Sequence, residues 1–200
     1  MDFKKLLFEV KLGFYLPFYN LYYRIWNFIN RNRDRLDFTK KTFPHTNFSH
    51  SVYDWQKREK QTNPKKEIQS GVINLDLAKK IHKECLINFK YVKDIDQFKI
   101  NDYWATSGEV LKEQKDDCDG FAVLIWRKLR DAGFPDDKIG MIIVPGHMCA
   151  CIYHSENDFI ILDNGFLTFS FEKASVFFST DRGKEKLPIL GFNMFYKWGY

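Results

Sequence analysis

The chain has 200 residues, of which 44% are hydrophobic and 28% are charged, a length that can bury one sizeable core and leave some residues for an extension. Its formal net charge of +5 is spread along the sequence without a zinc finger, an RNA-recognition signature or a long basic block, so we expect no nucleic-acid partner. The four cysteines form no framework of spaced pairs, which argues against a small secreted domain held by disulfides.

The N-terminal sequence contains an apolar stretch that Glu9 and Lys11 interrupt. Such a stretch forms neither a signal-peptide core nor a membrane span, so we expect a cytoplasmic protein with free thiols and no transmembrane segment. Between residues 16 and 30 the apolar residues recur at steps of three and four, which predicts an amphipathic helix after Pro17. We expect its apolar stripe to pack on the following domain or on a partner.

Residues 1–70 are aromatic and basic, and we interpret them as a helical extension followed by a linker. The second part, residues 31–70, is polar and is broken at Pro44 and Pro64. Polar runs with prolines are typical of irregular connections. We therefore expect the main domain to cover residues 71–200.

Two helices are predicted in this main domain. The first begins after Asn74, a suitable N-cap, and its apolar stripe includes Cys85, which we expect in the core. The second covers residues 117–130 and is expected to end before Gly133, because glycine is common just after the last helical residue.

Three strand-like runs follow, at residues 139–144, 147–153 and 159–162. They are joined by Pro145-Gly146 and by a polar turn, so they predict an antiparallel meander. A helix followed by such a meander predicts an α+β fold in which the second helix packs on an antiparallel sheet.

Three residues in this region have the types and the order of a catalytic triad. Cys118 stands at the opening of the second helix, His147 at the start of one strand, and Asp163 at the end of the next. They could supply a nucleophile, a general base and a residue that orients the base. Each has an ordinary structural interpretation by itself, as a core thiol, a strand histidine or a turn former. The catalytic interpretation depends on all three together.

Negative charge surrounds the cysteine, because Asp116, Asp117 and Asp119 are its near neighbours. Carboxylates raise the pKa of a thiol, whereas a helix N-terminus lowers it. One aspartate could cap the helix, a protonated His147 could pair with the thiolate, or a cation could bind the carboxylates.

A calcium ion takes about six to eight oxygen ligands, so further ligands would have to come from a loop such as residues 94–102. The alternative is that the remaining carboxylates are solvated. Cys149 and Cys151 share the strand face of His147, but a structural zinc site needs four ligands and the expected second cysteine pair is absent. We interpret these two cysteines as small strand residues.

The stretch from residue 91 to residue 164 resembles the bacterial transglutaminase-like cysteine peptidases. The resemblance is collinear and rests on YVKD at 91–94, DYWATSGE at 102–109, DDCDGFA at 116–122, GHM at 146–148 and ILDN at 161–164.

The resemblance implies a papain-like, transglutaminase-like fold with residues 71–200 as the catalytic domain. It implies that Cys118 is the nucleophile, that His147 is the general base and acid, and that Asp163 orients the imidazole. The oxyanion would be bound by the Cys118 amide and a second donor, for which Trp104 is a candidate.

In the calcium-dependent members of this group, acidic residues beside the cysteine hold the ion, and these correspond to Asp117 and Asp119. The triad itself requires no cofactor, so calcium is the only one that the resemblance implies. The chain differs from those members in having Ser107 where we expect proline, and in its aromatic, basic N-terminal segment.

We therefore expect a cysteine hydrolase, a peptidase or an amidase, that acts on a protein or peptide through a thioester at Cys118. Transfer of the acyl group to an amine, as in transglutaminases, uses the same first half-reaction and stays open. A catalytically silent binding or scaffold protein also stays open, although such a protein has no physical need for the complete triad.

Overall fold

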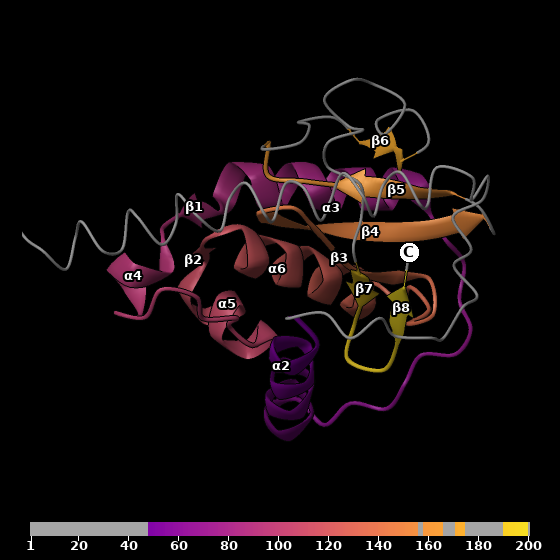
Figure 1. The fold of residues 1–200 in the computed structure, drawn as a ribbon. Helices are drawn as coiled ribbons and strands as arrows, with labels where there is room; N and C mark the ends of the chain where they lie inside the picture. The colour runs from indigo at the N-terminus through magenta and orange to yellow at the C-terminus, as the bar shows by residue number, and fades with distance from the viewer. Residues whose placement is uncertain (1–47, 156–157, 166–170, 175–189, 200) are drawn as a thin grey trace, which may run out of the picture. The chain divides into compact units, whose positions relative to one another are not determined.

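A computed structural model describes residues 48–155, 158–165, 171–174 and 190–199 (Figure 1). The chain divides into two compact units, Met1–Leu36 and Asp37–Tyr200, and all described residues belong to the second. The amphipathic helix expected between residues 16 and 30 lies outside the described residues.

The described strands build one six-stranded sheet in the order β6-β5-β4-β3-β7-β8, and every neighbouring pair is antiparallel. The three predicted strands are confirmed to within two residues at each end, whereas the two C-terminal strands were not predicted. The bounds are β3 Ile139–Val144, β4 His147–Ser155, β5 Asp158–Leu162, β6 Glu172–Lys173, β7 Leu190–Phe192 and β8 Lys197–Gly199.

Helix α6 (Cys118–Asp131) packs against β3 and β4 (Figure 1). The predicted helix at 117–130 is confirmed to within one residue, with Asp117 as its N-cap. Eleven of its fourteen residues are buried, so α6 is surrounded by protein on nearly all sides. Two further helices pack on it, α3 (Leu75–Asn88) and α5 (Ser107–Glu113).

Helix α3 begins as predicted, because the Asn74 side chain accepts a hydrogen bond of 3.0 Å from the Leu77 backbone N–H. Cys85 is buried, as expected of a core residue. The segment between α3 and α5 contains the short strand β1 (Lys90–Tyr91) and a short helix, α4 (Asp94–Gln97).

The expectation that residues 31–70 form an irregular connection is wrong for α2 (Phe48–Thr62). Trp55 of this helix is fully buried, and its ring meets those of Trp126 and Phe192 edge-on, with centroids 5.6 Å apart in both cases. The pattern was missed because the buried face of α2 also carries polar side chains, including the fully buried Glu59. Whether residues 71–200 form a domain that folds without residues 1–70 stays a prediction.

Glu59 explains the serine that stands in place of an expected proline. The Ser107 backbone N–H donates to Glu59 Oε2 at 2.8 Å, and the Ser107 hydroxyl donates to Glu59 Oε1 at 2.6 Å. Proline has no N–H to donate. The serine therefore connects α5 to α2. In the described parts of the chain, no helix is long and apolar enough to cross a membrane.

Candidate active site

A tight hairpin positions His147. Val144 and His147 are paired residues of β3 and β4, so only Pro145 and Gly146 form the loop between them. Gly146 has φ of +71°, a backbone conformation that glycine adopts without steric cost. The turn therefore makes His147 the first residue of β4, where its side chain is buried.

Asp163 follows directly after β5, and the structure brings it to His147. Asp163 Oδ1 lies 2.5 Å from His147 Nε2, and Asp163 Oδ2 accepts a hydrogen bond of 3.2 Å from the Gly165 backbone N–H. The Asp163 side chain is fully buried. The aspartate thus holds the imidazole by Nε2, so a proton exchange with a nucleophile would use the other ring nitrogen, Nδ1.

Cys118 is the first residue of α6, and the Asp117 cap accepts a hydrogen bond of 3.2 Å from the Asp119 backbone N–H. The backbone amide of Met148, the residue after His147, lowers the pKa of the Cys118 thiol. This influence places the sulfur near the start of β4, where the predicted base lies.

The surroundings of Cys118 favour the neutral thiol. Burial raises its pKa to about 12, and the carboxyl groups of Asp117 and Asp119 act in the same direction. The backbone amides of Met148 and of Cys118 itself oppose the rise. In the absence of a positive charge at the site, the thiol would thus stay protonated at neutral pH.

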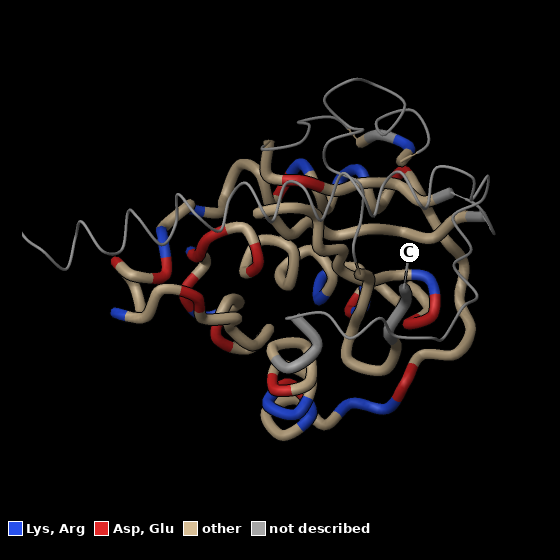
Figure 2. The backbone as a smooth tube through the Cα atoms, viewed as in Figure 1, with Lys and Arg blue, Asp and Glu red and all other residues tan. Residues whose placement is uncertain are grey.

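Four carboxyl groups gather around the start of α6. Strand β1 pairs in parallel with β2 (Lys115–Asp116), and this pairing brings the segment with Asp94 beside the residues that precede Cys118. Oxygens of Asp94, Asp116 and Asp117 lie within 4.8 Å of one another. A second group within the same distance joins Asp117, Asp119 and the Cys118 sulfur. Figure 2 shows the acidic residues along this side of α4, β2 and α6.

The acidic groups are short of partners. Asp94 Oδ1, Asp116 Oδ2 and Asp119 Oδ2 are buried and have no hydrogen-bond partner among the residues that the structure describes. Burial raises the pKa of Asp94 and Asp119, and it raises that of Asp116 to about 8. The charge of Asp117 adds to each of these rises. Unpartnered buried oxygens are rare in native proteins because they lose the hydrogen bonds of water.

Gly120 lies beside this cluster at a position that has no room for a side chain. A Cβ atom at this position would lie 2.4 Å or less from the Asp116 Cβ, Cγ and Oδ2 atoms. The carboxyl group of Asp116 therefore occupies the space that any other side chain would fill in the first turn of α6. This explains the glycine in the Asp-Asp-Cys-Asp-Gly run.

The carboxyl groups of Asp94, Asp116 and Asp117 fit a hard cation. Two oxygens bound to one calcium ion at 2.3–2.6 Å cannot be more than about 5 Å apart, and these three groups satisfy this limit among themselves, as Asp117 does with Asp119. The donors are oxygens without a histidine, which suits calcium better than zinc. The predicted ligands Asp117 and Asp119 both belong to this arrangement, and Asp94 lies in the loop from which further ligands were expected.

Trp104 does not offer its indole to an oxyanion in this structure. Its Nε1–H donates to Asp102 Oδ1 at 3.0 Å, and its ring stacks on Phe192 with centroids 5.6 Å apart. Trp104 is thus held as a core residue with a partnered N–H.

Two residues near the site were not assigned a role from the sequence. His82 of α3 is buried, and its Nε2 lies 2.7 Å from the Asp163 carbonyl oxygen. Tyr91 is 56% exposed, and the neighbouring Cys118 and Asp117 raise the pKa of its phenol in addition to burial. Only the contact itself could reveal His82, because 81 residues separate it from its partner.

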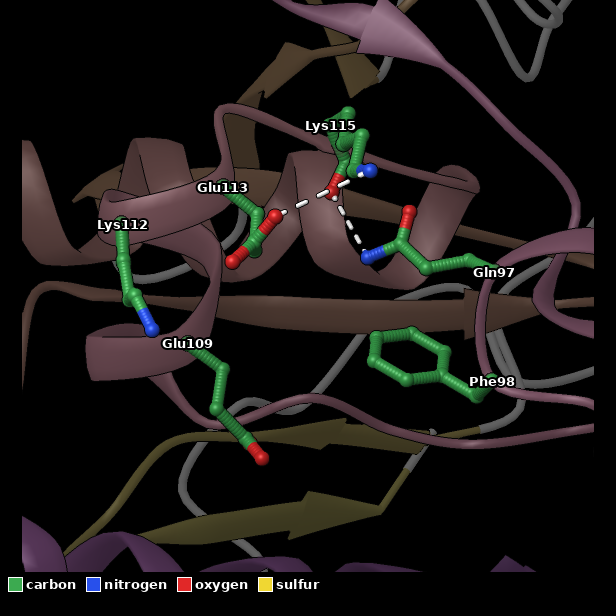
Figure 3. Close-up of a pocket in the computed structure, with 6 residues that line it drawn as sticks. All are labelled: Gln97, Phe98, Glu109, Lys112, Glu113 and Lys115. Carbon is green, nitrogen blue, oxygen red and sulfur yellow. Dashed lines mark hydrogen bonds and ion pairs between the residues drawn. The ribbon is translucent and has the colours of Figure 1, made fainter.

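A surface pocket of about 300 Å³ lies between α4, α5 and β2 (Figure 3). It is lined by Gln97, Phe98, Glu109, Lys112, Glu113 and Lys115. Lys115 pairs with Glu113 across 3.7 Å, and its carbonyl oxygen accepts a hydrogen bond from Gln97. None of the three predicted triad residues lines the pocket, so we do not assign it to the candidate active site.

Comparisons with known proteins support the fold. No protein-family model matches the chain, and no curated protein matches it. A solved structure of LapG from Legionella pneumophila is 20% identical, with a TM-score of 0.51, and the alignment covers 78% of this chain and 81% of that chain. EGTA-treated and calcium-bound LapG are each 19% identical, with TM-scores of 0.52, and cover 78% of this chain and 80% and 81% of their own.

LapG is a transglutaminase-like cysteine peptidase. At 20% sequence identity, this similarity supports a shared fold. The predicted fold class is confirmed at that level: the chain has a mixed helix and antiparallel-sheet structure with a transglutaminase-like fold.

Proposed function

We propose that the protein is a cysteine hydrolase that cleaves an amide bond of a protein or peptide through a thioester. Cys118 is the nucleophile, His147 the general base and acid, and Asp163 the residue that orients the imidazole. The fold shared with LapG supports this reaction class.

The observation that supports the proposal most is the meeting of three chain segments at the start of β4. His147 Nε2 lies 2.5 Å from Asp163 Oδ1, and the amide of the next residue, Met148, acts on the pKa of the Cys118 thiol. Nucleophilic catalysis by a thiol requires a histidine held by a carboxylate and a cysteine close to it, and a helix N-terminus favours the thiolate.

The proposed reaction has two halves. Cys118 gives its proton to His147 Nδ1 and its sulfur attacks the amide carbon, and the resulting imidazolium then protonates the leaving amine as the C–N bond breaks. In the second half His147 removes a proton from water, which attacks the thioester and releases the carboxylic acid and the Cys118 thiol. The Cys118 backbone amide at the start of α6 is one donor to the oxyanion.

We also propose that calcium binds to Asp94, Asp116, Asp117 and Asp119. The three unpartnered buried oxygens and the space left by Gly120 support this assignment. Calcium-bound and EGTA-treated forms of LapG are compatible with it. Burial and the carboxyl groups of Asp117 and Asp119 together raise the pKa of Cys118 to about 12, and a bound divalent cation would supply positive charge beside these carboxyl groups.

A thiol-labelling experiment tests the proposed function. The purified protein is treated with limiting iodoacetamide at neutral pH, with and without millimolar calcium, and the labelled cysteine is identified by mass spectrometry. We expect Cys118 to be labelled first when calcium is present. Substitution Cys118→Ala should abolish the fast labelling, whereas Cys85→Ala should retain it, because Cys85 is buried and its pKa is raised to about 11.

Two outcomes would contradict the proposal. If Cys118 reacts no faster than a free thiol under any calcium concentration, the protein is a scaffold with this fold. If Cys118 reacts and forms a thioester that amines capture faster than water does, the protein is an acyl transferase.

A further inference from the structure

His82 makes a contact that the triad alone does not explain. It lies on the inner face of α3 and is buried, with 3% of its surface exposed. Its Nε2 is 2.7 Å from the backbone carbonyl oxygen of Asp163. A carbonyl oxygen can only accept, so His82 must carry its proton on Nε2 to form this hydrogen bond.

The contact fixes the backbone at the residue that bears the orienting carboxylate. Asp163 lies at the end of β5, where the β4–β5 pairing last joins Ala150 with Leu162. Its carbonyl oxygen thus accepts a hydrogen bond from the His82 side chain at the point where the β4–β5 backbone pairing ends. With the peptide held by His82, the Asp163 side chain reaches His147 Nε2 and the Gly165 amide.

The same ring contacts the helix that carries the cysteine. His82 meets Phe121 edge-on, with centroids 6.4 Å apart and an angle of 67° between the planes. Phe121 is three residues after Cys118 in α6. Burial lowers the pKa of His82, which favours the neutral ring that this apolar contact and the single N–H donor require.

We propose that His82 is a positioning residue that holds Asp163 in the orientation in which it binds His147. His82 does not exchange a proton with substrate, and it acts through Asp163. The expected effect of His82 on reaction rate rests on the proposed function. The expected effect on the His147–Asp163 hydrogen bond does not depend on it.

The test compares three variants of α3. His82→Leu removes the donor and keeps an apolar side chain, His82→Gln restores an N–H near the position of Nε2, and Cys85→Ala removes a buried group from the same face of the helix without touching Asp163. The first readout is the downfield proton resonance of His147 Nε2–H, which reports its hydrogen bond to Asp163. The second is the rate of Cys118 alkylation.

We expect His82→Leu to broaden the His147 resonance or shift it upfield, and to slow the alkylation about tenfold, as the loss of one hydrogen bond would. His82→Gln and Cys85→Ala should keep both signals near those of the parent protein. In an Asp163→Ala background, His82→Leu should add no further loss of alkylation, because it acts through the missing carboxylate.

The outcomes separate this inference from the proposed function. An unchanged His147 resonance in His82→Leu overturns the inference, as does a loss that is equal in Cys85→Ala. A changed resonance in a protein whose Cys118 is unreactive supports the inference and rejects the proposed function.

Discussion

The two sides of the candidate active site differ in how far their polar groups are satisfied. On the hairpin side, the Asp163 carboxylate forms hydrogen bonds with His147 and with the Gly165 amide. The backbone carbonyl oxygen of Asp163 accepts a hydrogen bond from His82. On the helix side, Asp94, Asp116 and Asp119 each keep a buried oxygen without a partner. The carboxylate of the hairpin side is thus fully partnered, whereas three buried oxygens of the helix side have no partner among the described residues.

The difference indicates that the two sides make separate contributions to reactivity. The hairpin side fixes geometry through the contacts of Asp163 with His147 and His82, which lie 16 and 81 residues away in the sequence. The helix side affects whether the thiol can ionise, since burial raises the pKa of Cys118 and the carboxyl groups of Asp117 and Asp119 add to the rise. Changes to each side should therefore have distinguishable effects.

The largest expected effect comes from removing the carboxylate on the hairpin side. Asp163→Ala should slow Cys118-dependent turnover by about 10²–10⁴-fold, because His147 loses the group that holds its ring. Asp163→Asn keeps the size of the side chain and should leave residual activity. Steady-state rates and Cys118 alkylation rates measure both variants. Full activity in Asp163→Ala would show that Asp163 does not orient His147 in the reaction.

Calcium should stabilise the helix side. At about 100 times its Kd, a ligand that binds only the folded protein adds about 2.7 kcal/mol to the free energy of unfolding. We expect a higher Tm and faster Cys118 alkylation when calcium is added to chelator-stripped protein. Asp116→Asn should weaken both responses, since it removes the charge of a carboxyl group in the cluster.

The control for this titration is magnesium, which prefers a smaller octahedral shell and should stabilise the protein less. If neither Tm nor alkylation changes at millimolar calcium, the carboxyl groups are kept neutral by protons and the metal assignment is wrong.

Substitution of the glycine in the acidic run should cost about 1–3 kcal/mol, as other overpacked sites do. In Gly120→Ala the added Cβ would meet Asp116 atoms at 2.4 Å or less, so the carboxyl group has to move and calcium affinity should fall as well. Chemical denaturation and calcium titration measure the two losses. Gly108→Ala is the matched control, because nothing lies within 4 Å of a Cβ at that position of α5. Equal losses in the two variants would contradict the close-packing argument.

A smaller effect is expected in the pH dependence of stability. Without calcium, burial raises the pKa of Asp116 from its usual 3.8 to about 8, so the folded state binds more protons than the unfolded state between these values. The free energy of unfolding should therefore fall as pH rises from about 4 to about 8, by at most about 1.4 kcal/mol per pH unit for one proton.

The buried His82 contributes with the opposite sign, because its pKa is lowered and stability is lost as pH falls below its usual value of 6.5. The comparison of Asp116→Asn with the parent protein isolates the carboxyl group. Denaturation curves recorded at several pH values with a chelator give the free energy of unfolding, which should change less with pH in the variant than in the parent protein. Calcium binding to the parent protein should release protons. An identical pH dependence in both proteins would show that Asp116 is ionised throughout.

The sequence by itself determined the features that local patterns encode. The Asn74 cap, the apolar α6 and the strand-like runs of β3 to β5 depend on neighbours a few residues apart, so their limits could be read to within two residues. The collinear runs around Cys118 and His147 indicated the fold class, which the likeness to LapG confirms. The catalytic roles remain proposals.

Only the tertiary structure decided which distant groups meet. The burial of Glu59 against Ser107, the bond of His82 to Asp163 and the approach of Asp94 to Asp116 join residues that are between 22 and 81 positions apart. No local propensity records such contacts, because each depends on how completed helices and strands pack. For the same reason α2 was missed: its buried face carries glutamate and glutamine, whose partners lie on other elements.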